Sequence, residues 1–144
     1  LYTYNINLDR NVKSARTEAF VRPFPISYFK LIKSHAQNSL RQRGLSTQES
    51  EKLGDQAFIY WIIYVLVSNS LSIAKGKMNL EIAIKYQKKL IDDLTTNSDI
   101  SKSIRNYSPS REESQWIPRA LAWRSRKLLE FALAKRVKEI LRIK

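Results

Sequence analysis

Few side chains of this sequence could take part in acid–base, nucleophilic or metal chemistry. The 144 residues contain no Cys and one His, which leaves almost no basis for disulfides, thiol catalysis, thiolate zinc sites or clustered His ligands. His35 stands alone and is typical of a helix surface. Neighbouring acids in Asp92-Asp93 and Glu112-Glu113 point to different sides of a helix, so we expect solvation of the first pair and stabilisation of a helix N-terminus by the second. We therefore predict no catalytic residue, no metal, no cofactor and no enzymatic activity.

Positive charge is the main chemical feature of the sequence. There are 26 Lys and Arg against 13 Asp and Glu, a formal net charge of +13, and 43% of the residues are hydrophobic. The charge lies at the two ends, with a net +6 over residues 1–44, −1 over 45–100 and +8 over 101–144. An apolar middle between two basic ends favours a folded core flanked by regions that bind a phosphate polymer.

Candidate phosphate contacts come from three parts of the chain. The predicted nucleic-acid-binding residues are Arg10, Lys13, Arg16, Arg22, Lys30, Lys33, Arg41, Arg43, Arg124, Lys127, Lys135, Lys138 and Arg142. The last five form a stripe along a predicted helix, with Phe131 among them and no acid inside the arc. Five like charges repel one another unless an anion lies along them. Because these residues do not gather in one short reading helix, we expect contacts with phosphates and not with base edges.

The elements that would position these residues are predicted to be helical. Three Gly, four Pro and little alternation of period two favour an all-α fold. We expect a four-helix-type bundle over residues 26–144, preceded by an extended basic N-terminal arm at residues 1–25. The predicted helices cover residues 26–43, 47–75, 80–96 and 111–143, with a bend near Pro118 and a long loop over 97–110.

Local signals mark where these helices begin and end. Gly44 and Gly76 end the first two, and Ser46 with Glu49 forms a capping box at the start of the second. Asn79 is predicted to cap the third helix. Ser110 with Glu113 is a second capping box, which we expect to open the last helix.

The middle of the second predicted helix, residues 57–67, is apolar on every face. Eleven residues are too few for a membrane span, which needs about 20. One interpretation is a central core helix. The other is contact with a second subunit or lipid, because one layer of neighbours cannot cover the whole circumference in so small a protein, and of these we favour self-association. Trp61, Trp116 and Trp123 are expected to be core or subunit anchors and not base-stacking platforms.

Four features occur together in this sequence: a basic arm with Pro23 and Pro25, a basic helix to Arg43, a wholly apolar helix and a basic last helix. The sequence resembles the major coat proteins of filamentous and rod-shaped viruses of hyperthermophilic archaea. The resemblance implies helical subunits, often paired with a related coat subunit, that wrap double-stranded A-form DNA in a helical filament within the virion, with a lipid envelope as a further partner. The arm and the 26–43 helix would embrace the duplex, residues 57–67 would pack against neighbouring subunits, and Arg124 to Arg142 would line the DNA-facing wall.

Two other function classes remain open at this point. A cellular nucleic-acid-binding protein, ribosomal or of a chromatin or plasmid type, would share the charge without needing the apolar helix. A peripheral membrane-active protein would place the apolar run against lipid and the basic ends against anionic head groups. Filaments along duplex DNA are expected only of the coat protein, and binding to liposomes but not DNA only of the membrane protein.

Overall fold

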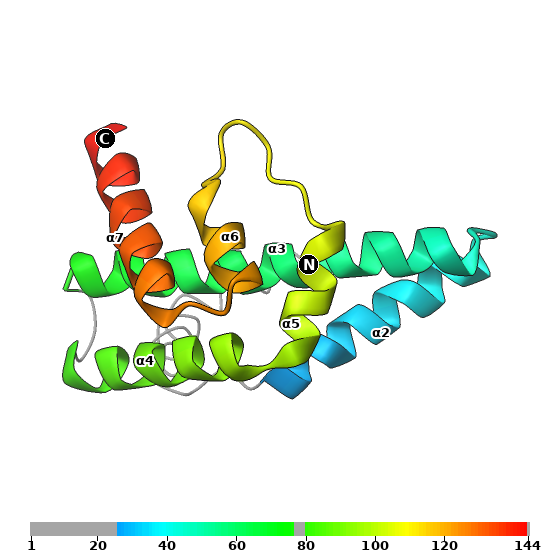
Figure 1. The fold of residues 1–144 in the computed structure, drawn as a ribbon, viewed down its shortest axis with the longest axis horizontal. Coiled ribbons are helices and arrows are strands. Elements are labelled where there is room, and N and C mark those ends of the chain that lie inside the picture. Colours follow the sequence, from blue (N-terminus) through cyan, green and yellow to red (C-terminus); the bar gives the residue numbers. More distant parts are fainter. Residues whose placement is uncertain (1–25, 77–79, 144) are drawn as a thin grey trace, which may run out of the picture.

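The computed structural model describes residues 26–76 and 80–143, which form helices joined by short connections (Figure 1). The elements are α2 (Ile26–Gln42), α3 (Thr47–Ala74), α4 (Leu80–Thr96), α5 (Ser98–Ser103), the 3-10 helix η1 (Ile104–Asn106), α6 (Trp116–Ala122) and α7 (Arg126–Ile143). The all-α prediction is confirmed. A four-helix bundle is not confirmed, because the described residues form six α-helices and one 3-10 helix. The predicted arm, residues 1–25, lies outside the described residues.

The longest helix, α3, is the element around which the others pack. It runs along the long axis of the molecule and contacts α2, α4, α5, η1 and α7 (Figure 1). Phe58 and Ile62 of α3 are buried in the hydrophobic core, which also contains Leu94 of α4, Ile117 of α6 and Leu129 of α7. Because α3 supplies buried residues along much of its length, the position of α7 and its charges depends on the packing of α3.

The turn between α2 and α3 follows the sequence signals. Gly44 has a φ of 95°, and the backbone N–H groups of Gly44 and Leu45 donate to the carbonyls of Arg41 and Leu40. This is a Schellman motif, in which glycine adopts the left-handed conformation without steric cost. Ser46 Oγ accepts a hydrogen bond from the backbone N–H of Glu49 at 3.1 Å. The predicted N-cap of α3 is therefore confirmed, while the predicted cap Asn79 lies outside the described residues.

A buried amide holds α4 against α3. Gln87 is 7% exposed, and its Nε2 donates to the carbonyl of Leu66 at 3.1 Å and to Ser70 Oγ at 3.0 Å. Its Oε1 accepts from Asn69 Nδ2 at 3.2 Å. Because the amide is satisfied by three partners on α3, its burial is not costly and fixes the register of the two helices.

The prediction of one helix over 111–143 is wrong. The chain forms α6 and α7 there, separated at residues 123–125. Arg124 has a φ of 53°, and the N–H groups of Arg124 and Ser125 donate to the carbonyls of Leu121 and Ala120, which again makes a Schellman motif. Pro118 causes no bend because it is the third residue of α6, where a backbone N–H has no helical partner in any case.

The region predicted to be a long loop contains α5 and η1. Asn97 Oδ1 accepts from the N–H of Asp99 at 2.9 Å and caps α5, and Ile100 and Ile104 turn inward to the core. The second capping box does not open a helix. Ser110 Oγ contacts Glu113 Oε1 at 3.2 Å, but α6 begins only at Trp116, where Ser114 Oγ accepts from the backbone N–H of Ile117 at 3.3 Å.

Candidate nucleic-acid interface

A basic stripe lies along α7, and we define it as Lys127, Lys135, Lys138 and Arg142. The helix forms with Leu129, Ala132 and Leu133 buried against the core, so residues on the opposite side must face solvent. All four stripe residues are exposed. None forms an ion pair or side-chain hydrogen bond with another residue of the described ranges. Four unpaired cations over about 22 Å of helix, at 1.5 Å per residue, suit a linear polyanion.

The arginines of α7 outside the stripe are used within the protein. Arg126 pairs with Asp92 of α4 at 2.7 Å and with Glu130 at 3.2 Å. Arg136 pairs with Glu139 at 3.3 Å and donates to the carbonyl of Glu112 at 2.8 Å. The acids of this region are thus matched to arginines off the stripe, which leaves its positive charge uncompensated.

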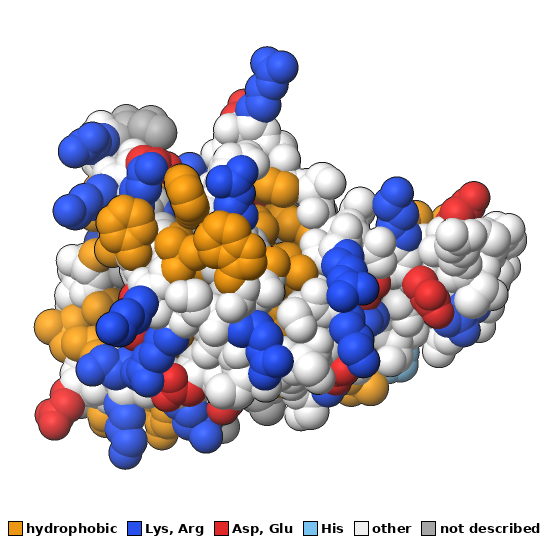
Figure 2. Space-filling model, viewed as in Figure 1, with side chains coloured by type: hydrophobic (Ala, Val, Ile, Leu, Met, Phe, Trp, Pro, Cys, Tyr) orange, Lys and Arg blue, Asp and Glu red, His pale blue; other side chains and the backbone are white. Residues whose placement is uncertain are grey.

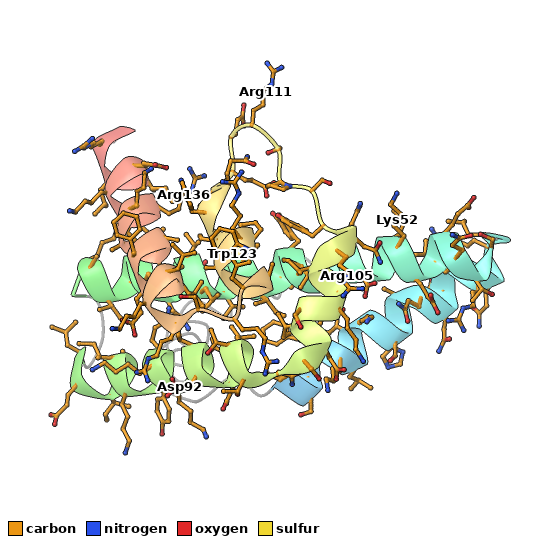
Figure 3. The ribbon with its side chains drawn as sticks, viewed as in Figure 1. Lys52, Asp92, Arg105, Arg111, Trp123 and Arg136 are labelled. Atoms are coloured by element: carbon orange, nitrogen blue, oxygen red, sulfur yellow. The ribbon has the colours of Figure 1, made fainter. Side chains whose placement is uncertain are left out.

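Exposed aromatic rings accompany the stripe. Trp123, between α6 and α7, is 65% exposed, and Phe131, between Lys127 and Lys135 on α7, is 61% exposed. Hydrophobic side chains gather over α6 and α7 on the face shown in Figure 2, with Lys and Arg around them. Trp123 stands on this face (Figure 3). None of the three tryptophans lies in the core, because Trp61 and Trp116 are also exposed.

Arg124, which was predicted to belong to the stripe, has another role. Its Nε donates to the carbonyl of Thr95 at 3.1 Å, and its Nη2 donates to the carbonyl of Thr96 at 2.7 Å. These carbonyls end α4 and have no helical partners of their own. The guanidinium therefore caps α4 and joins that helix to the α6–α7 junction.

Two of the predicted residues on α2 are also engaged in ion pairs. Lys30 Nζ lies 2.6 Å from Asp99 Oδ2, and the Lys30 ammonium holds the pKa of that carboxyl below its usual value. Lys33 Nζ lies 2.7 Å from Asp55 Oδ1 of α3 and also contacts Ser103 Oγ at 3.2 Å. The Asp55 carboxylate is largely buried and takes a second bond from Asn106 Nδ2 at 2.7 Å. This network joins α2, α3 and η1.

The remaining predicted contacts are not brought to α7. Arg41 and Arg43 are exposed at the turn between α2 and α3, at the opposite end of the long axis from α7 (Figure 1). Arg10, Lys13, Arg16 and Arg22 lie outside the described residues. Within residues 26–76 and 80–143, the predicted set is therefore split between the α7 stripe, the α2–α3 turn and side chains bonded within the protein, which are Lys30, Lys33 and Arg124.

Further exposed arginines were missed by the sequence reasoning. Arg105 of η1 and Arg111, in the segment before α6, stand on the viewed face (Figure 3), and both are exposed. Arg119 of α6 lies over the ring of Trp116, with its guanidinium carbon 5.1 Å from the ring centroid. The net charge of residues 101–144 includes all three, but a helical wheel of the last helix alone could not place them.

The described residues offer little for metal chemistry. No group of three or more His, Cys, Asp or Glu side chains among them could hold a metal ion. Tyr107 Oη donates a 2.5 Å hydrogen bond to Glu113 Oε2, and burial together with this bond raises the pKa of the phenol. That pair links the segment before α6 to the end of η1.

Comparison with known proteins gives no relative for this chain. No family model, curated protein or solved structure matches it.

Proposed function

We propose that this protein is a structural nucleic-acid-binding coat protein that assembles into a helical filament and binds double-stranded DNA without regard to sequence. The observation that carries the proposal is the unpaired basic stripe of α7. Lysine and arginine side chains that bind phosphates release the counterions of the duplex, which makes binding strong at low salt and independent of base order.

The exposed aromatic rings next to the stripe are a second feature that favours α7 as the DNA-binding surface. Trp123 and Phe131 add flat apolar area beside the cations, which suits contact with the sugars of a duplex and reads no base sequence. The coat role adds self-association, for which the support is the large apolar area that α3 leaves exposed, including Tyr60, Trp61 and Tyr64. A partner subunit of related sequence and a virion location remain part of this proposal.

Measurement of DNA affinity at several salt concentrations tests the binding role. The variant Lys127→Gln/Lys135→Gln/Lys138→Gln removes three stripe charges without touching the core. For the full chain and a random-sequence duplex, we expect the slope of log K against log salt to become shallower by about 1 for each lysine removed.

The matched control removes three lysines from α4, as Lys85→Gln/Lys88→Gln/Lys89→Gln. These residues are also exposed, but Glu81 and Asp92 share their side of the helix. We expect a much smaller change in the slope for this variant. Equal slopes for the two triple variants would show that the effect comes from net charge and that α7 is not the interface.

A peripheral membrane protein is the second candidate, and one observation favours it. Of the helices in the described ranges, α3 alone is long and apolar enough to cross a membrane by length and composition, and only 22% of its most apolar window is buried. Such a helix is weak evidence by itself. Sedimentation with anionic vesicles in the absence of DNA binding would favour this candidate over the coat protein.

A further inference from the structure

An apolar seam with heptad spacing runs along the side of α3 that faces away from Phe58 and Ile62, where the other described helices leave it exposed or half-exposed. Its positions alternate in steps of four and three residues, and each is exposed or half-exposed: Leu53, Ala57, Tyr60, Tyr64, Val67, Leu71 and Ala74. This spacing, sustained over three heptads, is the pattern by which one helix packs against another in a coiled coil. The seam is about 32 Å long at 1.5 Å per residue.

No solvated charge interrupts the seam. Between Leu53 and Ala74 the only Asp, Glu, Lys, Arg or His is Asp55, which is turned inward to Lys33 and Asn106. Tyr64 is 54% exposed at the middle of the seam, and the ring of Trp61 stacks edge-on against both Tyr60 and Tyr64, with centroids 6.3 and 5.6 Å apart. A monomer would expose this aromatic cluster to water at a considerable free-energy cost.

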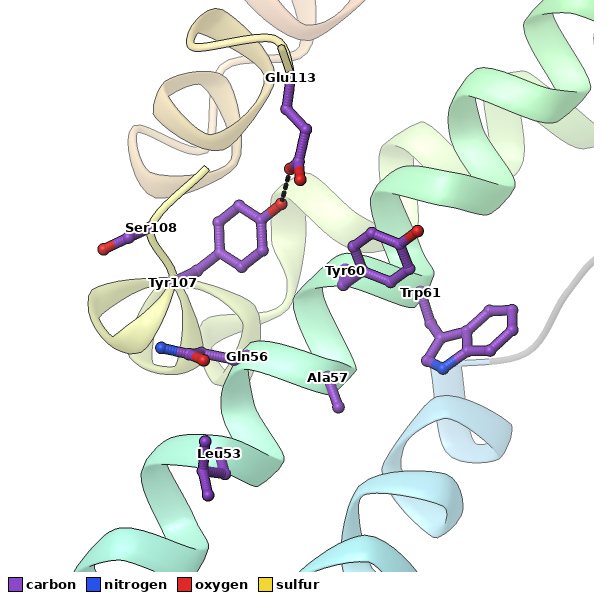
Figure 4. Close-up of a pocket in the computed structure, with 8 residues that line it drawn as sticks. All are labelled: Leu53, Gln56, Ala57, Tyr60, Trp61, Tyr107, Ser108 and Glu113. Atoms are coloured by element: carbon purple, nitrogen blue, oxygen red, sulfur yellow. Dashed lines mark hydrogen bonds between the residues drawn. The ribbon is translucent and has the colours of Figure 1, made fainter. Parts of the chain in front are cut away.

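The surface beside the seam is hollowed. A hollow of about 380 Å³ lies between Leu53, Ala57 and Tyr60 of α3 and the side chains of Tyr107 and Glu113 across from them (Figure 4). A smaller one, about 130 Å³, continues along Tyr64 and Val67 toward Ile117 and Ile140. The two hollows share Tyr60 and Glu113 and together follow the seam from Leu53 to Val67.

We infer that the seam of α3 binds the α3 seam of a second copy of this chain, as an antiparallel pair related by a two-fold axis. This inference deepens the proposed function and rests on it for the idea of assembly. A heptad stripe fits another heptad helix better than it fits lipid, because α2, α4, η1 and α7 already cover the other sides of α3. The second copy supplies a helix of the required length and pattern.

The antiparallel direction follows from charge and from side-chain layers. A parallel pair would align the helix dipoles and set Glu49 beside Glu49 and Lys75 beside Lys75. In an antiparallel pair whose two-fold axis passes the seam at the level of residue 62, Glu49 of one copy lies near Lys75 of the other. The same register sets Leu53 against Leu71, Ala57 against Val67 and Tyr60 against Tyr64, and only Ala74 lies beyond these apolar layers.

Charge placement in the seam tests both the pairing and its direction. In the full chain without nucleic acid, we expect a concentration-dependent dimer by analytical ultracentrifugation. Tyr60→Glu/Tyr64→Glu should shift the equilibrium to monomer. Tyr60→Lys/Tyr64→Glu should retain the dimer, because opposite charges face each other only in the antiparallel arrangement. Leu31→Glu, which alters an exposed leucine of α2 away from the seam, is the control and should leave the dimer unchanged.

Cross-linking gives a second readout that does not depend on destabilising the protein. Since the chain has no Cys, a mixture of Leu53→Cys and Leu71→Cys chains should form a disulfide-linked dimer on oxidation, while neither variant alone should cross-link efficiently. Efficient cross-linking of Leu53→Cys alone would overturn the antiparallel arrangement. A wild-type chain that stays monomeric at tens of micromolar, or vesicle binding that depends on Tyr60 and Tyr64, would overturn the pairing itself.

The dimer and the DNA interface can fail independently in these experiments. If the wild-type chain dimerises through α3 but does not bind duplex DNA, the pairing stands and the coat proposal fails. If Tyr60→Glu/Tyr64→Glu binds DNA with the wild-type salt slope and the wild-type chain never dimerises, the α7 interface stands and the pairing fails.

Discussion

Arg124 shows most clearly that an exposed positive charge does not by itself identify a phosphate-binding residue. It is exposed, as a phosphate-binding arginine would be, but it donates to the carbonyls of Thr95 and Thr96 and sits in the left-handed conformation at the α6–α7 junction. Positive φ at a residue other than glycine costs about 1 kcal/mol and persists here because these bonds hold it.

Replacing Arg124 should therefore affect stability more than DNA binding. We expect Arg124→Gln to lower the free energy of unfolding by about 1–2 kcal/mol, because two charge-assisted bonds to the end of α4 are lost. Urea denaturation measures this change. The salt slope of DNA binding should stay at the wild-type value, and a slope reduced by about 1 would instead assign Arg124 to the phosphate contacts.

Tyr107 gives a prediction at alkaline pH. Its folded-state pKa is raised by burial and by the hydrogen bond to Glu113, so the folded protein keeps the phenol proton after the unfolded chain, with a pKa near 10, begins to lose it. The contribution of the Tyr107 phenol to the free energy of unfolding is therefore complete below pH about 10 and decreases above it. We expect the stability of Tyr107→Phe to fall less steeply between pH 9.5 and 11 than that of the wild type, as followed by urea denaturation. Parallel curves would contradict this account.

At the scale of elements, the packing of α2 against α3 leaves no room for a Cβ at Gly54 unless the Gln37 side chain moves. A Cβ added there would lie 2.4 Å from Gln37 Cγ. Alanine in place of a helical glycine stabilises a helix by up to about 1 kcal/mol. We expect this gain for Gly54→Ala only in a Gln37→Ala background, and a smaller gain or a loss when Gln37 is present. A double-mutant cycle measured by denaturation checks this, and additive effects would show that Gln37 moves aside freely.

Some elements were predictable from local signals, and others were not. The bounds of α4 and the start of α3 agree with the sequence reasoning because Ser46, Gly76 and the apolar spacing act within one or two turns. The short helix α5 had a signal that was overlooked, since Asn97 is followed by inward isoleucines at positions 100 and 104. The break before α7 had none, because its left-handed residue is an arginine.

At the scale of the whole molecule, the candidate site was predictable only in part. The exposed stripe of α7 follows from helical periodicity, which needs only neighbouring residues. The engagement of Lys33 with Asp55 and of Lys30 with Asp99 depends on packing between segments far apart in the sequence. Charge counting could not separate such internal pairs from the free cations of the surface.

The arrangement places two different surfaces on one small protein. The stripe of α7 presents unpaired positive charge, and the seam of α3 presents aromatic and aliphatic side chains in heptad spacing. In the proposed coat, the two-fold pair closes on itself, so successive dimers are held in line by the duplex that their stripes bind.

Electron microscopy of the purified full chain mixed with duplex DNA, followed by nuclease digestion, tests this account most directly. We expect regular filaments whose length follows the length of the duplex, with the enclosed DNA protected from the nuclease whatever its sequence. Single particles that leave the DNA bare and fully digested in low-salt buffer would contradict the account.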